Sequence, residues 1–384
     1  MRDSPVPPRA SRALITIAHL LICAPLIATG CNGDGPSGTG GSASGLVRSW
    51  VSTPTTAGND WVGGAPAVDG GRVFVQEANN LVGLDAESGR RLWTRRIRVA
   101  PSPPPTELRA GGGRVFVSET DSIMSIDGAT GATVWSVHPD SQAVVSPALD
   151  ATGFYTGQRG VPVVYALDRN TGTIRWKVNV GPGYTFAAHV HGVAVSGDTV
   201  YAAVERYLDR NGVSSTGVLV ALDRADGREL WRYETTTTKN YFIEAPLPLG
   251  TSVIVDDFGG GALVAIDVVS HREVWRTPVG GSIGVVLVGG MLLTASVDHQ
   301  ARALDPATGT VKWRTETGSS ALGVGACGGQ LWVSALSLRR YDASSGQITG
   351  ESGAGGAGGF VTHLAGDGSR IYVTGTSGVS AFAC

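Results

Sequence analysis

The segment Leu219–Trp231 (LVALDRADGRELW) has copies along the chain, and these copies constrain the fold more than any other feature. Each copy has a short apolar run, a turn that begins with Asp, and a second run that ends on Trp. The copies recur roughly every 40 residues, a spacing typical of proteins built from stacked structural repeats. The turns begin at Asp85, Asp127, Asp168, Asp223, Asp267, Asp305 and Asp342. The Trp positions are Trp93, Trp135, Trp176, Trp231, Trp275 and Trp313, with Trp50 in a partial copy near the N-terminus.

Each residue type of the repeat has a physical task. An Asp carboxylate accepts hydrogen bonds from backbone N–H groups two or three residues further on and closes the turn. A Gly supplies the positive φ that a hairpin turn needs, and a Trp has the apolar face to fill the gap between packed sheets. Two copies deviate, because His271 replaces the turn Gly in the fifth copy and Gly350 replaces the Trp in the seventh. We expect His271 to strain its turn.

Two further strand-like runs precede each turn, so every repeat has four. In the first copy they are 64–69, 72–76, 80–84 and 90–95. Four strands in about 40 residues are the signature of a β-propeller blade. Seven blades carry the turn, and residues 360–384 supply three strands of an eighth. We therefore predict an all-β, eight-bladed β-propeller over residues 46–384, with four antiparallel strands per blade. Residues 46–50 supply the missing strand, and this closure removes exposed sheet edges.

The N-terminal residues 1–30 have the pattern of a signal peptide. Three Arg residues precede an apolar stretch, 13–28, that is too short for a stable membrane span. The stretch ends at Cys31 in a pattern that resembles a bacterial lipobox, so we expect Cys31 to carry a lipid. An ordinary signal peptide with a coincidental Cys is the alternative. Residues 31–45 lack large apolar side chains and are expected to form a flexible Gly/Ser tether between lipid and propeller.

Two cysteines remain in the exported body, Cys327 and Cys384. A disulfide between them suits an oxidising compartment. The sequence leaves the pairing open, because it does not reveal whether their Cα atoms approach closely enough.

The run Ala303–Trp313 (ALDPATGTVKW) resembles the tryptophan-docking repeat of quinoprotein-type propellers. The resemblance extends over residues 46–384. That group contains pyrroloquinoline quinone (PQQ) dehydrogenases and non-enzymatic relatives such as the BamB-like lipoproteins of outer-membrane protein assembly. Many of the dehydrogenases have a pair of adjacent cysteines over the cofactor, and this chain has none. The resemblance therefore implies a non-catalytic scaffold without a cofactor, and a PQQ- or metal-dependent enzyme or a small-ligand binder in the central channel is the alternative.

Deviations from the repeat indicate where a partner could bind. The fourth repeat contains an insertion, 205–217, on the same side of the ring as the blade connections 181–186 and 235–242. Aromatic residues with Arg are typical anchors of protein interfaces, although surface loops also accept insertions without function. The predicted interaction face consists of Tyr184, Phe186, Arg206, Tyr207, Tyr241 and Phe242.

A His-Val-His run, His189–His191, lies in the expected innermost strand of the fourth blade. Residues i and i+2 of a strand point to the same side, so both imidazoles could bind one metal ion. Alignment of the repeats places Glu244 at the position of His191, which suggests a carboxylate as third ligand. The competing interpretation, which we favour, is a polar lining of a wet channel.

These features predict a monomeric, non-catalytic envelope protein that is anchored to a membrane through its lipid, the outer membrane in particular. The expected partner is an envelope protein, such as the outer-membrane assembly machinery. A net charge of −2 gives no reason to expect nucleic acid as a partner.

Overall fold

The computed structural model describes residues 44–53, 62–98, 108–119, 122–139, 144–158, 160–235, 242–352, 361–375 and 378–384. These residues belong to the unit Ala43–Cys384, and a second unit comprises Met1–Ser42. The predicted signal peptide and Cys31 therefore lie outside the described residues. In the described part of the chain, no helix is long and apolar enough to cross a membrane.

The described residues form eight β-sheets, which confirms the predicted all-β class and the number of blades. Blades 1 to 4, each from its innermost strand outward, consist of β3 (Val62–Asp69), β4 (Arg72–Glu77), β5 (Asn80–Asp85), β6 (Arg91–Arg96); β7 (Arg109–Gly111), β8 (Arg114–Ser118), β9 (Ile123–Asp127), β10 (Thr133–Val137); β11 (Val144–Leu149), β12 (Gly153–Gln158), β13 (Val163–Asp168), β14 (Ile174–Asn179); and β15 (Ala188–Ser196), β16 (Thr199–Tyr207), β17 (Ser215–Asp223), β18 (Glu229–Glu234).

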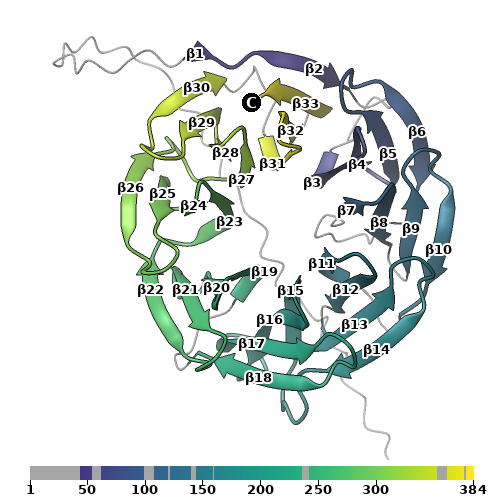
Figure 1. Ribbon diagram of the computed structural model, residues 1–384, viewed down its shortest axis with the longest axis vertical. Coiled ribbons are helices and arrows are strands. Elements are labelled where there is room, and N and C mark those ends of the chain that lie inside the picture. The colour runs from purple at the N-terminus through teal and green to yellow at the C-terminus, as the bar shows by residue number, and fades with distance from the viewer. Residues whose placement is uncertain are drawn as a thin grey trace, which may run out of the picture. The chain divides into compact units, whose positions relative to one another are not determined.

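Blades 5 to 8 follow the same order around the ring (Figure 1). They consist of β19 (Phe242–Leu249), β20 (Ser252–Asp257), β21 (Ala262–Asp267), β22 (Glu273–Pro278); β23 (Ser282–Val288), β24 (Met291–Ser296), β25 (Gln300–Leu304), β26 (Val311–Glu316); β27 (Gly323–Cys327), β28 (Gln330–Ser334), β29 (Leu338–Asp342), β30 (Ile348–Ser352); and β31 (Val361–Gly366), β32 (Arg370–Gly375), β33 (Gly378–Ala383), β2 (Arg48–Ser52).

The ring closes as predicted, because the N-terminal strand β2 pairs antiparallel with β33 and completes blade 8. One detail differs from the expectation. The short strand β1 (Ser44–Gly45) pairs in parallel with β30 and adds a fifth strand to blade 7. The last two residues of the predicted tether therefore belong to the folded body, because their backbone completes hydrogen bonds at the outer edge of blade 7.

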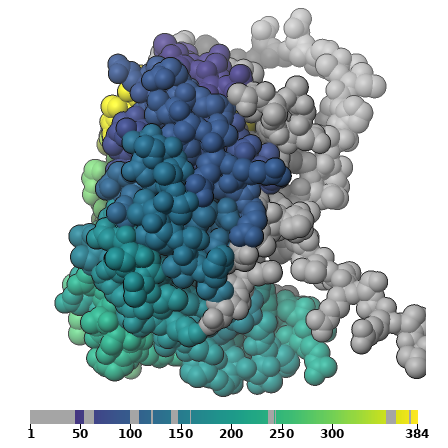
Figure 2. All heavy atoms as spheres, turned by 90° about the vertical axis from the view of Figure 1, so that its right-hand side faces the viewer, coloured from purple at the N-terminus to yellow at the C-terminus, as the bar shows by residue number. Residues whose placement is uncertain are grey.

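Neighbouring blades bury the core between them. The described apolar side chains form eight clusters, and each cluster combines residues from two adjacent blades. Figure 2 shows consecutive blades side by side, with the colour changing from purple through blue to teal along the ring. The core is thus a series of layers, one at each seam between two blades.

The repeat residues meet at these seams. In six of them the Trp Nε1–H donates to the carbonyl oxygen of the residue after the turn Asp in the next blade, at 2.8–3.1 Å. The Gly of the same turn lies under the indole ring. A Cβ at this Gly would come within 2.4–2.8 Å of the Trp at Gly89, Gly131, Gly172, Gly227, Gly309 and Gly346. The Gly therefore serves the Trp contact as well as the turn.

The turns themselves are closed by their Asp carboxylates. Asp127 Oδ1 accepts from the N–H groups of Ala129 and Thr130 at 3.1 and 2.8 Å, and the other turns have the same kind of contact. At the fifth turn, His271 has a φ of 58°, the strained conformation expected of a side chain in a Gly position. Its ring stacks on Trp231, with the ring centres 4.8 Å apart.

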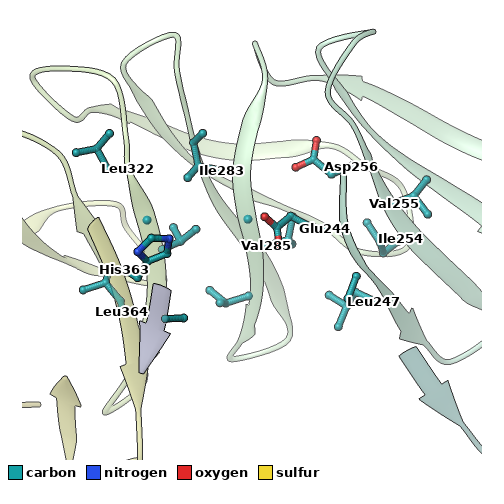
Figure 3. A pocket seen from close by; sticks show the side chains of 16 residues that line it. Glu244, Leu247, Ile254, Val255, Asp256, Ile283, Val285, Leu322, His363 and Leu364 are labelled. Atoms are coloured by element: carbon teal, nitrogen blue, oxygen red, sulfur yellow. The ribbon is translucent and has the colours of Figure 1, made fainter. Parts of the chain in front are cut away.

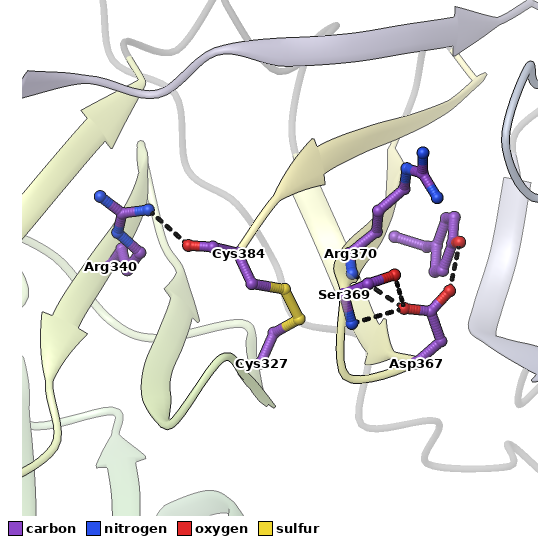
Figure 4. Close-up of a disulfide and its surroundings, with 7 residues drawn as sticks. Cys327, Arg340, Asp367, Ser369, Arg370 and Cys384 are labelled. Carbon is purple, nitrogen blue, oxygen red and sulfur yellow. Dashed lines mark hydrogen bonds between the residues drawn. A yellow bond between two sulfur atoms is a disulfide. The ribbon is translucent and has the colours of Figure 1, made fainter.

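The seam between blades 7 and 8 is built differently, since Gly350 stands at its Trp position. The structure joins Cys327 and Cys384 across this seam in a disulfide, with Cα atoms 5.5 Å apart (Figure 4). Arg340 donates to the Cys384 carbonyl oxygen at 3.0 Å and lies over the buried ring of Trp332. The disulfide and the buried Trp332 of β28 thus replace the contact that a repeat Trp makes with the Asp turn of the next blade at the other seams.

Candidate functional site

Blade 4 carries the longest hairpin of the ring. Its strands β16 and β17 have nine residues each, and they remain paired from Thr199–Asp223 to Tyr207–Ser215. Most of the predicted insertion therefore extends two strands, and only residues 208–214 form a loop. Asp209 orders this loop by accepting from the N–H groups of Asn211, Val213 and Ser214 at 2.6–3.2 Å. At the tip, Val213 is 69% exposed.

An arginine and aromatic cluster lies along this hairpin. The Arg206 guanidinium is 4.6 Å from the centre of the Tyr184 ring, and its Nη1 donates to Glu234 at 2.7 Å. Arg232 donates to the Tyr184 hydroxyl at 3.1 Å. Burial raises the pKa of Tyr184, so its hydroxyl stays neutral. These contacts hold Arg206 and Tyr184 in place while both remain half-buried.

The other residues of the predicted interaction face differ in their surroundings. Tyr207 and Phe186 are half-buried, and the Tyr207 ring meets the His189 ring at 5.2 Å. The prediction for Phe242 is wrong, because its side chain is fully buried in the apolar layer between blades 4 and 5. Gly217 leaves room for this ring, since a Cβ there would touch it at 3.0 Å. Tyr241 lies outside the described residues.

The two histidines of the His-Val-His run approach a carboxylate, although a different one from that expected. Ligand atoms of His189, His191 and Glu205 lie within 4.8 Å of one another, and His191 Nε2 is 3.1 Å from Glu205 Oε2. His191 sits in a β-bulge, which turns its ring towards Glu205. Burial would raise the pKa of Glu205, but the hydrogen bonds from His191 and Ser215 and the charges of the two histidines together lower it.

The expected third ligand, Glu244, is therefore wrong for this cluster, because the register of β15 and β16 pairs His189 directly with Glu205. Two imidazoles and a carboxylate can bind a zinc-like ion. Without a metal ion, the His191–Glu205 contact still stabilises the pairing of β15 with β16.

A second site lies at the ring axis, between the inner strands of blades 5 to 8. A cavity of about 370 Å³ is lined by residues of β19, β20, β23, β27 and β31, together with Leu322 and with Ala65 of β3 (Figure 3). Its polar side chains are Glu244, Asp256 and His363, and its other side chains are aliphatic. Sequence reasoning missed Asp256 and His363; the only signal for Asp256 was a pair of adjacent carboxylates, Asp256 and Asp257, after an apolar run. The two carboxyl groups do not fit an anionic cofactor such as PQQ.

Comparisons with known proteins agree with this fold. In solved structures, the chain is similar to BamB from Moraxella catarrhalis, with a TM-score of 0.65 and 14% identity over 88% of this chain and 100% of that one. It is also similar to the quinohemoprotein alcohol dehydrogenase ADHIIG from Pseudomonas putida HK5, with a TM-score of 0.64 and 14% identity over 87% of this chain and 72% of that one. BamB and an alcohol dehydrogenase thus share the fold, so the fold alone does not decide the function.

The computationally designed protein Ika8 is a further similar structure, with a TM-score of 0.70 and 12% identity over 89% of this chain and 100% of that one. Among curated proteins, no sequence matches. One family model matches residues 43–161, 161–277 and 215–334, and its description is outer membrane protein assembly factor BamB. These matches extend over most of the propeller, and the chain belongs to the BamB family of PQQ-like β-propellers.

Proposed function

We propose that the protein is a non-catalytic, lipid-anchored propeller scaffold that binds a partner protein in the bacterial envelope. The family description, outer membrane protein assembly factor, supports a specific role in the assembly of outer-membrane proteins. The lipobox-like pattern at Cys31 and the Gly-rich segment after it support an anchor that lets the propeller stand off the membrane.

The long blade-4 hairpin is the observation that carries the proposal. It presents an exposed apolar tip at Val213 and, beneath the tip, the half-buried pair of Arg206 and Tyr184. Interface anchors are commonly arginine and aromatic side chains that are already held in place before binding. The loop is ordered by Asp209, so a partner would not need to order it on binding.

Site-specific photocrosslinking in the full, membrane-anchored chain tests the proposal. A photoreactive residue at Val213 should crosslink a discrete partner, and one at Val134, 42% exposed on the outer strand of blade 2, should not. The double variant Arg206→Ala, Tyr207→Ala should lower the crosslink yield at Val213 by about tenfold or more, as for loss of interface anchors. Equal yields at Val213 and Val134 would contradict a blade-4 interface.

The anchor has its own test. Cys31→Ala should abolish incorporation of a labelled fatty acid and release the protein from the membrane fraction. Continued membrane association without the label would show that the anchor is not a lipid on Cys31.

A further inference from the structure

Glu244 has a backbone conformation for which blade 1 uses a Gly. It lies in a β-bulge of β19, between the paired residues Ile243 and Leu247, and its φ is 64°. The equivalent bulge of blade 1 lies between Gly63 and Ala67 and has the related sequence Gly-Ala-Pro, with Gly64 at a φ of 74°. A side chain at positive φ costs energy, and such strain tends to persist at ligand sites. Blade 5 thus has Glu at a position where blade 1 has Gly, which adopts this φ without strain.

Asp256 is the second unusual carboxyl group. It is 6% exposed, and both of its oxygens lack a hydrogen-bond partner in the described structure. The Ser282 hydroxyl lowers the pKa of Asp256 in part. In the structure this hydroxyl hydrogen-bonds with the Thr294 hydroxyl and the Gly284 carbonyl oxygen. Burial and the charge of Glu244 raise the pKa of Asp256 well above its ordinary value. A buried polar group without a partner calls for an explanation, such as a ligand that is bound there.

The adjacent Asp257 shows what a structural carboxylate looks like in this fold. It accepts from Arg276 Nη1 at 2.6 Å and from the Gly260 N–H at 3.0 Å. Blade 1 has a comparable ion pair, in which Glu77 takes the place of Asp257 and pairs at 2.9 Å with Arg91, from a different position of the outer strand. At the place of Asp256, blade 1 has Gln76, whose amide donates to a backbone carbonyl oxygen. Blades 1 and 5 thus share a carboxylate–arginine pair at this place, whereas the unpartnered acid of Asp256 occurs in blade 5 and not in blade 1.

Both acids line the axial cavity, together with the His363 ring, whose buried Nδ1 also lacks a partner. Burial lowers the pKa of His363, so the imidazole is neutral and does not supply a positive charge to the acids. The rest of the wall is aliphatic, with Leu247, Ile254, Ile283, Val285, Leu322 and Leu364 around the polar groups (Figure 3). A ligand with a charged end and an apolar body matches such a wall.

We propose that the axial pocket binds a small organic cation, with its ammonium group between Glu244 and Asp256 and its alkyl body against the aliphatic wall. The positive charge relieves the repulsion between the two acids and gives Asp256 a hydrogen-bond donor. A single metal ion fits less well, because in the described residues only His189, His191 and Glu205 bring three ligand atoms within 4.8 Å of one another. An anion would meet two acids and no cationic side chain in the lining.

Calorimetric titration of the full chain with hexylammonium chloride tests this assignment, with hexanol and hexanoate as neutral and anionic isosteres and calcium chloride as the metal arm. Hexylammonium should bind at least tenfold more tightly than either isostere. Glu244→Gln and Asp256→Asn should each weaken its binding at least tenfold, and the surface control Glu229→Gln should leave it unchanged.

Glu244→Gly distinguishes lost binding from lost folding. It restores the residue that blade 1 uses, so it should raise the melting temperature of the free protein while it abolishes hexylammonium binding. The assignment is overturned if hexylammonium does not bind, if hexanoate binds equally well, or if Glu244→Gly and Asp256→Asn leave the affinity unchanged. Calcium binding that depends on both acids, without hexylammonium binding, would likewise overturn it.

Discussion

The seam between blades 5 and 6 and the seam between blades 7 and 8 solve the same packing problem by different means. In the first, Trp275 lies on Gly309 and donates to the carbonyl oxygen of Pro306 at 3.0 Å. In the second, Gly350 replaces the Trp, and a disulfide joins the two blades. The topology explains the difference. The outer strand of blade 8 is β2, from the other end of the chain, so no Asp turn connects it to β33 and offers the carbonyl oxygen.

This comparison shows that the contact at a seam needs two parts, the Trp of one blade and the Asp turn of the next. The Trp belongs to one blade and its acceptor turn to the next, so a blade without the turn cannot use the Trp of its neighbour. A seam that lacks one half needs a substitute, and here the substitute is covalent.

The largest expected effect comes from removal of a repeat Trp. Trp275→Ala should lower the free energy of unfolding by about 4 kcal/mol, because it leaves a cavity in the layer between blades 5 and 6. Chemical denaturation measures the change. Trp275→Phe, which keeps most of the volume and loses the hydrogen bond, should cost clearly less. Similar losses for Ala and Phe would mean that the hydrogen bond, and not the packing, holds this seam.

Removal of the disulfide should have the next largest effect. Cys327 and Cys384 are 57 residues apart, and a disulfide typically contributes about 3 kcal/mol to the free energy of unfolding. The double variant Cys327→Ala, Cys384→Ala should show this loss without reductant. Dithiothreitol should destabilise the wild type by a similar amount and leave the double variant unaffected. A wild type that is insensitive to reductant would show that the bond does not stabilise the seam.

Two glycines of similar φ separate strain from contact at the Trp seams. Gly309 has a φ of 68°, and a Cβ there would lie 2.6 Å from Trp275, whereas Gly329 has a φ of 70° and open space around it. Gly329→Ala should cost about 1 kcal/mol for backbone strain alone. Gly309→Ala should cost about 1 kcal/mol more, because the Trp must move. If denaturation experiments give equal losses for the two variants, the contact with Trp275 does not contribute to the cost at Gly309.

Most of the fold follows from the sequence because the repeat marks each blade with residues of fixed function. Asp and Gly locate the turns, Trp locates the seams, and the partial copy at Trp50 predicts the ring closure. Even the deviation at His271 has the positive φ that its position requires. These features are local, so a single chain reveals them without knowledge of neighbours in space.

The candidate sites were harder to predict, because they depend on contacts between strands. Glu205 faces His189 through the register of β15 and β16, and the alignment of repeats pointed to Glu244 instead. Phe242 looked like a surface anchor at the end of a connection, but its seam buries it. Asp256 and His363 come together only because blades 5 and 8 both face the ring axis.

The seam between blades 3 and 4 adds a polar contact whose contribution depends on pH. Burial would raise the pKa of Asp150, but the N–H groups of Thr152 and Gly153, the Tyr155 hydroxyl and Arg224 of the next blade lower it to about 2, from 3.8. The carboxylate therefore stabilises the fold above pH 3.8, and this stabilisation is lost as the pH falls through about 2.

Asp150→Asn should consequently cost about 1 kcal/mol at neutral pH, allowing for solvent screening, and progressively less in acid. Denaturation of wild type and variant at a series of pH values between 2 and 6 gives the difference. Asp226→Asn, in an exposed turn, serves as the control. A difference that stays constant with pH would mean that the charge of Asp150 is not what stabilises this seam.

The smallest expected effect tests the topological explanation itself. Gly350→Trp, in the background without the disulfide, restores the Trp half of the repeat contact to the seam between blades 7 and 8. It should recover essentially none of the lost stability, because no Asp turn links β33 to β2 and because β1 pairs beside residue 350. Recovery of about 1 kcal/mol or more in chemical denaturation would show that a Trp can hold a seam without its acceptor turn. The contact would then depend on apolar packing alone, and the carbonyl oxygens that the other six Trp residues use would be incidental to it.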